Sequence, residues 1–299
     1  MTGATGFVGQ RVVAQLRAEG VDVVGAARGH GPGGEPWASF DLLKASAPRD
    51  LIAAVRPTHL IHLAWNATPG RFWTAPDNLS WTAASAALVR SFWDAGGERL
   101  VMAGSVAEYD WSTDILGDTS NMAPATLYGT AKDALRRLIE AAARQEDRSF
   151  AWGRIFWLYG PGEHRNRLVS DVAANLAAGL PVECSEGFQE RDFLHVDDVA
   201  SAFVAALRSD WRGPFNVASG RAVAVRDLIG RLGELSGRPD LIRYGARPTP
   251  ANEPPVLVAD VRALIDGIGF TPRWSLDDGL ADAWAYWRAQ PALDSAPRR

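Results

Sequence analysis

The chain has 299 residues, of which 31 are basic and 35 acidic, and its formal net charge of −4 includes no long run of one sign. The lack of a basic patch argues against nucleic-acid binding, and the single Cys184 excludes an internal disulfide and a cysteine-based metal site. No stretch approaches the roughly 20 apolar residues that cross a bilayer, and no secretory signal is recognisable, so we expect a cytoplasmic protein without a membrane partner.

Short apolar strands alternate with helical stretches along the first two-thirds of the chain. We predict strands over residues 21–27, 59–64 and 99–103, and helices over 10–19, 79–95 and 126–144. Continuous apolar strands that alternate with helices form a parallel sheet covered on both faces. After residue 155 the pattern loosens into Gly- and Pro-rich turns, with shorter helices over 225–235 and 276–288.

A glycine-rich loop opens the chain and runs straight into the first predicted helix. It carries Gly3, Thr5, Gly6, Phe7, Val8 and Gly9. Glycines at such a turn let the backbone approach a pyrophosphate, whose charge the helix N-terminus favours, as in a Rossmann-type doubly wound sheet. The strand that should precede the loop is missing from the sequence. Either the recorded start lies too far downstream or the sheet lacks its central strand, and the cost of losing a central strand favours the first explanation.

The end of the second predicted strand bears on the choice of dinucleotide. An acidic residue there would bind the ribose hydroxyls of NAD, whereas an arginine accommodates the 2′-phosphate of NADP. The strand ends in Arg28 with no acid, so we predict that the cofactor is NADP(H), with NAD as the alternative. The alternative for Arg28 itself is a solvated arginine on the surface that contacts no cofactor. Asp41 is placed to accept a hydrogen bond from the adenine amino group, or else to cap a helix that begins near Leu42.

Tyr128 and Lys132 are four residues apart, about one helical turn, so they project from the same face. A lysine cation favours the phenolate and lowers the pKa of a tyrosine from its usual value of about 10. A hydroxyl from Ser105 facing the phenol would hold a carbonyl or alcohol oxygen between them. These groups suit the oxidation of an alcohol or the reduction of a ketone. Taken alone, the pair is also what an ordinary exposed helix carries.

Further motifs occur in a fixed order along nearly the whole chain. They are residues 2–9, Asp41-Leu42, His62-Leu63-Ala64, Asn78, Ser105 with Glu108-Tyr109, 128–132, 154–162 and 191–199. With these motifs the chain resembles the extended short-chain dehydrogenase/reductases of the NAD-dependent epimerase/dehydratase family, which act on nucleotide sugars. The resemblance implies a dinucleotide-binding domain over 1–157, to which 193–217 returns, and a smaller C-terminal α/β substrate domain made of 158–192 and 218–299.

The resemblance also implies roles for single residues. Tyr128 is then the acid/base, Lys132 binds the nicotinamide ribose, and Ser105 holds the sugar oxygen. Leu63 and Ala64 line the cofactor, Arg191 contacts the diphosphate of the substrate, and Asn78 supports the backbone of the active site. A homodimer formed through the helices near 79–95 and 126–144 is implied by the resemblance alone.

Three departures from the family pattern bear on the reaction. Val106-Ala107 stands where dehydratases of the family carry an Asp-Glu pair, which argues against dehydration and leaves Glu108 a structural role. Trp157 replaces an asparagine that contacts the nucleotide sugar, and Trp65 replaces a small residue. Both tryptophans either narrow the substrate pocket or pack in the core.

Two groups of polar residues are predicted to be structural or solvent-exposed and not to bind a metal or a substrate. His59 and His62 face opposite sides of a strand and cannot share a metal, and 195–198 forms a strand–helix junction, so we predict no metal site. The polar loop 163–167 is read as solvated, although it could close over a substrate.

The sequence therefore predicts an NADP(H)-dependent enzyme that reduces a keto group of a nucleotide-activated deoxysugar. A nucleotide-sugar 4-epimerase with tightly bound NAD is the alternative within the family. A dinucleotide-binding sensor or scaffold without catalysis is the alternative of another class. Retention of both Tyr128 and Lys132 argues against that last reading.

Overall fold

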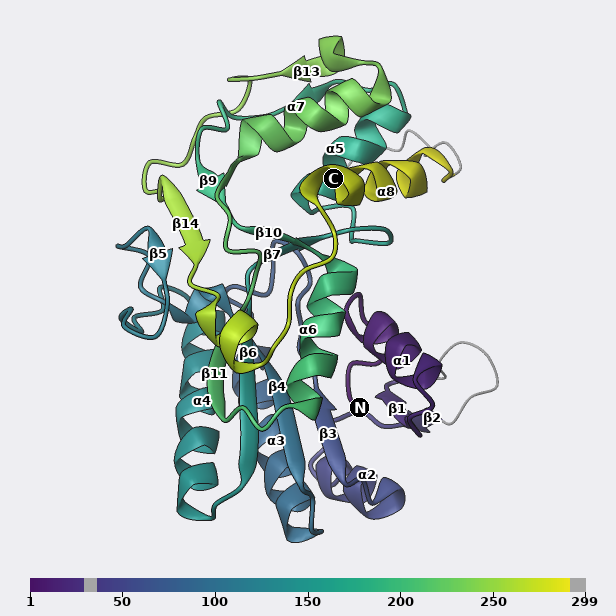
Figure 1. Cartoon of the computed structure of the whole chain (residues 1–299), viewed down its shortest axis with the longest axis vertical. Coiled ribbons are helices and arrows are strands. Elements are labelled where there is room, and N and C mark those ends of the chain that lie inside the picture. The colour runs from purple at the N-terminus through teal and green to yellow at the C-terminus, as the bar shows by residue number, and fades with distance from the viewer. Residues whose placement is uncertain (30–36, 291–299) are drawn as a thin grey trace.

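A parallel β-sheet forms the centre of the larger part of the molecule (Figure 1). The computed structural model describes residues 1–29 and 37–290. The strands of this sheet are β1 (Gly25–Ala27), β2 (Trp37–Ser39), β3 (His59–His62), β4 (Arg99–Ser105), β6 (Ser149–Ile155) and β11 (Gly213–Val217). Strand β1 pairs with β2, and β3, β4, β6 and β11 follow one another in that order, all in parallel register.

Met1 and Thr2 lie between β1 and β3, where the central strand was expected. Thr2 forms parallel bridges to Ala26 and to His62, and its amide donates to the Ile61 carbonyl at 3.0 Å. The sequence as given thus supplies two residues to the central position of the sheet, and the glycine-rich loop follows them directly.

Helices cover both faces of the sheet. Helices α1 (Gly9–Ala18) and α6 (Val196–Arg208) pack together on one face (Figure 1). Helices α2 (Ala47–Val55), α3 (Asp77–Asp94) and α4 (Leu127–Gln145) form a layer on the other face. Successive strand residues point to opposite faces, so Ile61 packs in the cluster under α6, whereas Leu60 packs in the cluster under α3. The predicted doubly wound α/β fold is confirmed.

The observed boundaries differ from the predicted ones mainly at one strand. The predicted helices lie within two residues of α1, α3, α4, α7 (Val225–Ser236) and α8 (Leu276–Arg288). Strand β1 begins at Gly25 instead of residue 21, because Val21 and Asp22 are exposed and pair with no neighbouring strand. Helix α5 (Leu168–Ala177) was not predicted from the loosened pattern.

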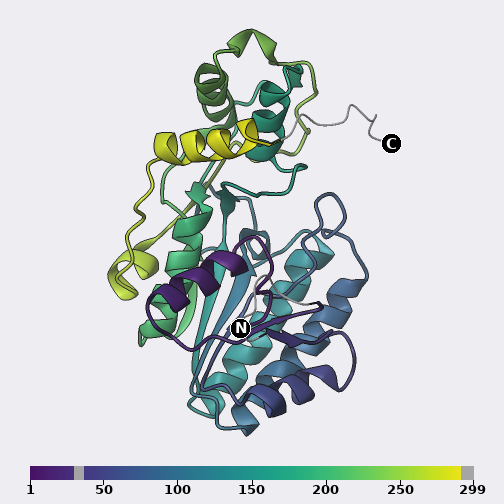
Figure 2. The same ribbon diagram turned by 90° about the vertical axis from the view of Figure 1, so that its right-hand side faces the viewer.

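A smaller α/β part lies at the carboxyl ends of the sheet strands (Figure 2). Helices α5, α7 and α8 pack around a separate apolar cluster that contains Leu228 and Leu280. Its short strands are β5 (Ile115–Leu116), β7 (Trp157–Tyr159), β8 (Val182–Glu183), β9 (Glu190–Arg191), β10 (Phe193–His195), β12 (Val223–Ala224), β13 (Ile242–Arg243) and β14 (Val256–Ala259). Single turns are η1 (Val106–Glu108), η2 (Pro239–Leu241) and η3 (Ala263–Gly267).

Buried polar contacts hold the smaller part together, and an apolar segment joins it to the larger part. Asp192 is fully buried and accepts hydrogen bonds from the amides of Ser219, Gly220 and Ala259. Leu264 and Phe270 pack back into the cluster under α6, so this late segment contacts the larger part of the molecule. The predicted domain boundaries remain a proposal, and the last residues of the substrate domain, 291–299, lie outside the described residues. Within the described ranges no helix combines the length and apolarity needed to cross a membrane.

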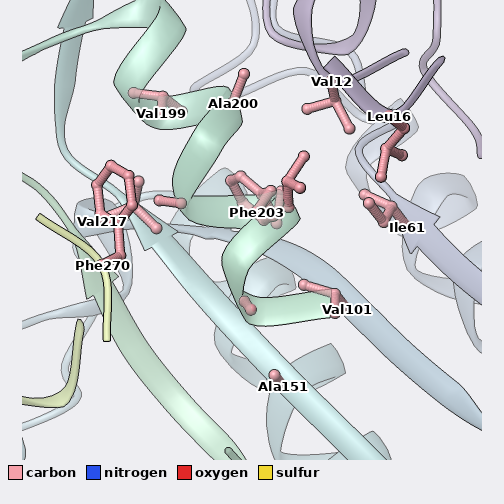
Figure 3. Packing of buried hydrophobic residues seen from close by; sticks show 14 of the residues in the cluster. Val12, Leu16, Ile61, Val101, Ala151, Val199, Ala200, Phe203, Val217 and Phe270 are labelled. Carbon is pink, nitrogen blue, oxygen red and sulfur yellow. The ribbon is translucent and has the colours of Figure 1, made fainter. Parts of the chain in front are cut away.

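A substitution of Phe203 on α6 tests how strongly the apolar cluster under α6 stabilises the fold (Figure 3). Its side chain is fully buried and lies 6.4 Å from the Phe215 ring, centroid to centroid. Phe203→Ala should lower the free energy of unfolding by about 3–5 kcal/mol, because it leaves a cavity in the core. Urea denaturation measures this, with the half-exposed Leu235→Ala as a control expected to change little. Equal losses in both variants would contradict the packing described.

Candidate active site

Close backbone contacts hold the glycine-rich loop in place and leave no room for a side chain at Gly3 or Gly9. Gly3 has φ +69°, and a Cβ there would lie 2.7 Å from the Ala64 nitrogen. A Cβ at Gly9 would lie 2.0 Å from the Gly3 carbonyl oxygen. Since the loop presents bare backbone at the N-terminus of α1, its residues fit a dinucleotide pyrophosphate.

One cavity of about 580 Å³ joins this loop to the predicted catalytic residues. The predicted site residues that line it are Gly3, Gly6, Phe7, Val8, Gly9, Leu63, Trp65, Ser105, Tyr128, Lys132 and Trp157. The cavity is large enough for a ligand of drug size. The structure therefore brings the glycine-rich loop and the Ser-Tyr-Lys trio into a single site.

The other predicted cofactor residues lie at the margin of this cavity or beyond it. Arg28 is exposed just after β1, and Thr5 is exposed in the loop. The Asp41 carboxylate accepts a hydrogen bond from the Leu43 amide at 3.2 Å within a turn, and Leu42 is a core residue. The prediction that Asp41 caps a helix near Leu42 is wrong, because the next helix, α2, begins at Ala47. Ala64 meets the loop through its backbone. Their cofactor roles stay predictions.

Ser105, Tyr128 and Lys132 are positioned by two adjacent elements. Ser105 is the last residue of β4, and Tyr128 and Lys132 lie in the first turns of α4. The Thr126 hydroxyl caps this helix by accepting from the Gly129 amide at 3.1 Å. A Cβ at Gly129 would lie 2.1 Å from the Ala107 carbonyl oxygen, so this glycine lets α4 approach η1 closely.

Burial moves the pKa values of the two titratable groups predicted to be catalytic, Tyr128 and Lys132, in opposite directions. Burial raises the pKa of Tyr128 to about 12, and a hydrogen bond with Ser105 acts against that rise. Burial lowers the pKa of Lys132 to about 7, and the negative charge of Glu108 opposes this. The expected lowering of the Tyr128 pKa is therefore not what the structure shows, because desolvation of the phenolate outweighs the charges around it.

Glu108 organises the turn that follows Ser105. It is fully buried and accepts hydrogen bonds from the Ser105 amide at 2.8 Å and from Arg154 Nε at 2.9 Å. The Ser105 hydroxyl in turn accepts from the Ala107 amide, which completes a capping box around η1. The structural role predicted for Glu108 is thus supported.

Sequence reasoning missed a wall of aromatic side chains that surrounds Tyr128. Phe72 and Trp73 lie edge-on to the Tyr128 ring, with centroids 4.8 and 5.8 Å away. Asn78 holds their loop by donating to the Phe72 and Ala75 carbonyls, as its predicted supporting role requires. No secondary-structure pattern marks residues 65–75, so only the fold reveals this wall.

Arg191 is buried behind Trp157 and is not among the residues that line the cavity. Its guanidinium carbon lies 5.3 Å from the Trp157 ring centroid, and it forms an ion pair with Glu253. Contact between Arg191 and a substrate diphosphate stays a prediction.

The predicted absence of a metal site concerns residues that have other partners. His62 Nδ1 is hydrogen-bonded to Thr2 and its Nε2 to Ser85, while His59 is exposed. His195 Nδ1 accepts from the Asp197 amide and so caps α6. Across residues 1–29 and 37–290, no cluster of three or more potential ligands suits a metal ion.

Comparison with known proteins then identifies the family. A family model described as "NAD dependent epimerase/dehydratase family" matches residues 1–218. The chain belongs to the epimerase/dehydratase family.

Among curated relatives of this family member, a "UDP-glucose 4-epimerase" of Rhizobium leguminosarum bv. trifolii is 28% identical over 172 residues. That match covers 54% of this chain and only 50% of the relative. A "dTDP-6-deoxy-L-talose 4-dehydrogenase (NAD(P)(+))" of Kitasatospora kifunensis is 28% identical and matches 97% of this chain and 95% of its own length. Among solved structures, MoeE5 in complex with UDP-glucose and NAD is 31% identical, covers 96% and 97% of the two chains, and has a TM-score of 0.82.

This epimerase/dehydratase family member places the loop 163–167 against the cavity. Glu163, His164 and Arg167 line it, and Glu163 is 7% exposed with a carboxyl oxygen that has no hydrogen-bond partner in the described part of the chain. The solvated reading of the loop is therefore wrong for Glu163. Burial raises the pKa of Glu163 to about 8, and the positive charge of Arg167 opposes the rise.

The raised pKa of Glu163 makes stability depend on pH in a defined direction. The folded protein holds this proton up to pH of about 8, whereas the unfolded chain releases it at about 4.5. The contribution of Glu163 to stability is therefore lost as the pH rises between these values.

Glu163→Gln cannot ionise, so its Tm relative to the wild type should be higher at pH 8 than at pH 5. Thermal denaturation at several pH values measures this, and the exposed Glu98→Gln is the control. A Tm difference that is the same at every pH would contradict this assignment.

Proposed function

We propose that the protein transfers hydride at a ring carbon of a nucleotide-activated sugar, reducing a keto group with NADP(H). The observation that carries the proposal is the single cavity shared by the glycine-rich loop and the trio of Ser105, Tyr128 and Lys132. The match to a nucleotide-sugar 4-dehydrogenase over nearly the whole chain supports the same chemistry.

In this reaction Tyr128 donates a proton to the sugar oxygen. Its raised pKa keeps the phenol protonated at neutral pH, which suits a proton donor. Ser105 lies beside the phenol at the end of β4 and holds the same oxygen by a hydrogen bond. The nicotinamide cofactor supplies the hydride when it is bound, and Lys132 is the residue that would meet its ribose.

Net reduction is supported by the side chain at the end of β1. Arg28 is exposed there, and Ala27-Arg28-Gly29 at the end of β1 holds no carboxylate to pair with the ribose hydroxyls of NAD. A cofactor that is exchanged at each turnover suits reduction. We also propose a homodimer formed through α3 and α4, on which Leu79 and Leu138 are exposed, and a cytoplasmic location.

A second candidate is a nucleotide-sugar 4-epimerase that retains NAD. The observation in its favour is the similarity to MoeE5, whose solved structure holds UDP-glucose and NAD. The same trio serves this reaction, because Tyr128 would remove and return the proton of one hydroxyl.

Purified protein mixed with NADPH and dTDP-4-keto-6-deoxyglucose should oxidise NADPH in proportion to the sugar reduced. Absorbance of NADPH and chromatography of the sugar measure this. Arg28→Ala should raise the KM for NADPH while leaving that for NADH unchanged. Interconversion of UDP-glucose and its C4 epimer without net NADPH loss would favour the second candidate. If the protein converts neither of these two sugars, both candidate functions are contradicted.

Tyr128→Phe should lower the turnover rate by about 10²–10⁴, because the substituted ring has no proton to give. Calorimetric titration should show that the Kd for the dinucleotide is unchanged. Tyr286→Phe on α8, away from the cavity lining, is the matched control and should keep wild-type turnover. An unaffected rate in the Tyr128 variant would exclude the proposed mechanism.

A further inference from the structure

Trp65 presents the face of its indole ring to the ammonium group of Lys132. The Lys132 Nζ atom lies 3.9 Å from the centroid of the Trp65 ring. This is well inside the range of about 6 Å in which a cation is attracted to a ring face, and tryptophan is the strongest partner of this kind. The ammonium also donates to the Ala103 carbonyl oxygen at 2.9 Å, and it lies 5.9 Å from the centroid of the Trp152 ring, at the limit of that range.

Three contacts fix the position of this indole. Its Nε1 donates to the Asn78 side-chain oxygen at 2.8 Å, and its ring stacks on Trp81 with centroids 6.1 Å apart. Its other neighbour is Tyr128, edge-on at 6.4 Å between centroids. Asn78 is itself anchored to the carbonyls of Phe72 and Ala75. The ring face is therefore a fixed part of the site.

Lys132 needs such a partner because it is 4% exposed. Its charge loses hydration on burial, and an uncompensated buried cation is costly. Glu108, the carboxylate whose charge acts on Lys132, is hydrogen-bonded to Arg154 and Trp152 and to the Ser105 amide. The compensating contacts of the ammonium are thus a carbonyl oxygen and aromatic rings, of which Trp65 is the nearer.

We propose that Trp65 is a positioning residue that keeps Lys132 cationic and directs its ammonium group within the cavity. The catalytic use of that cation rests on the function proposed above. Trp65 was expected either to narrow the substrate pocket or to pack in the core. It lines the cavity and also packs against the cluster under α3, and its contact with Lys132 gives it a further role in the charge state of the site.

The titratable groups that interact with Lys132 are Glu108 on η1 and His62 on β3, and Tyr128 lies one helical turn before it on α4. Burial lowers the pKa of His62 to about 3, so it carries no charge at neutral pH, and the Tyr128 phenol is likewise neutral. Because burial lowers the pKa of Lys132 to about 7, a small change in its surroundings alters its charge near neutrality. Loss of the ring face should lower this pKa further.

The charge of Lys132 can be measured directly, because Lys44 and Lys132 are the two lysines of the sequence. Protein labelled with ¹³C at the lysine ε-carbon gives one resonance for each, and the pH midpoint of the Lys132 resonance reports its charge directly. Trp65→Leu should lower that midpoint by about half to one pH unit, and Trp65→Phe, which keeps a ring face, by less. Lys44, exposed and remote, serves as the internal reference.

Tetrafluorotryptophan inserted at position 65 alone separates the electrostatic effect of the indole face on Lys132 from the effect of its size. It keeps the size of the indole and weakens the negative potential of its face, so it should lower the Lys132 midpoint without a change in Tm. Trp111→Leu removes an indole from the same cavity wall, where it contacts Trp157 and not Lys132, and should leave the midpoint unchanged.

A fluorinated variant with the wild-type midpoint would overturn the inference, as would equal midpoints in the wild type and Trp65→Leu. Because the titration needs no turnover, these results are independent of the proposed function. Failure of that function would appear instead as wild-type protein that turns over neither sugar.

Discussion

The buried carboxylate of Glu108 is the constraint on which the active site depends. A fully buried carboxylate is stable only when its oxygens have partners, and here these are the Ser105 amide, the Trp152 indole and the Arg154 guanidinium. Two of the partners come from β6 and one is the backbone of Ser105, the serine proposed to hold the sugar oxygen. Satisfying this one charge therefore fixes the end of β4 against β6 and sets the place of the Ser105 hydroxyl.

The same network reaches the smaller part of the molecule. Arg154 donates to the Tyr109 hydroxyl, which donates to the Asn216 side chain on β11. Asn216 then donates to the carbonyls of Leu116 and Asp260, close to β5 and β14. Since buried hydrogen bonds are costly to break, the walls of the cavity are held in a defined position relative to Ser105, Tyr128 and Lys132.

Burial also sets the chemistry of the trio. It favours the neutral form of both Tyr128 and Lys132, which keeps the proton on the phenol and works against the charge of the ammonium. A protonated phenol is what the proposed role of Tyr128 as a proton donor requires. The lysine does need a partner that stabilises its cation, and the surrounding aromatic residues provide one in Trp65.

Local sequence determined the doubly wound sheet, the glycine-rich loop and the trio, because strand and helix periodicity, tight turns and one-turn spacing are properties of short segments. It also indicated that Val106-Ala107 lacks the acids of a dehydratase. Only the tertiary structure decided that Trp65 lies on Lys132, that Arg191 is paired with Glu253, and that Glu163 is buried in the cavity wall. Each of these results from contact between segments far apart in the chain, and no local pattern encodes which segments meet.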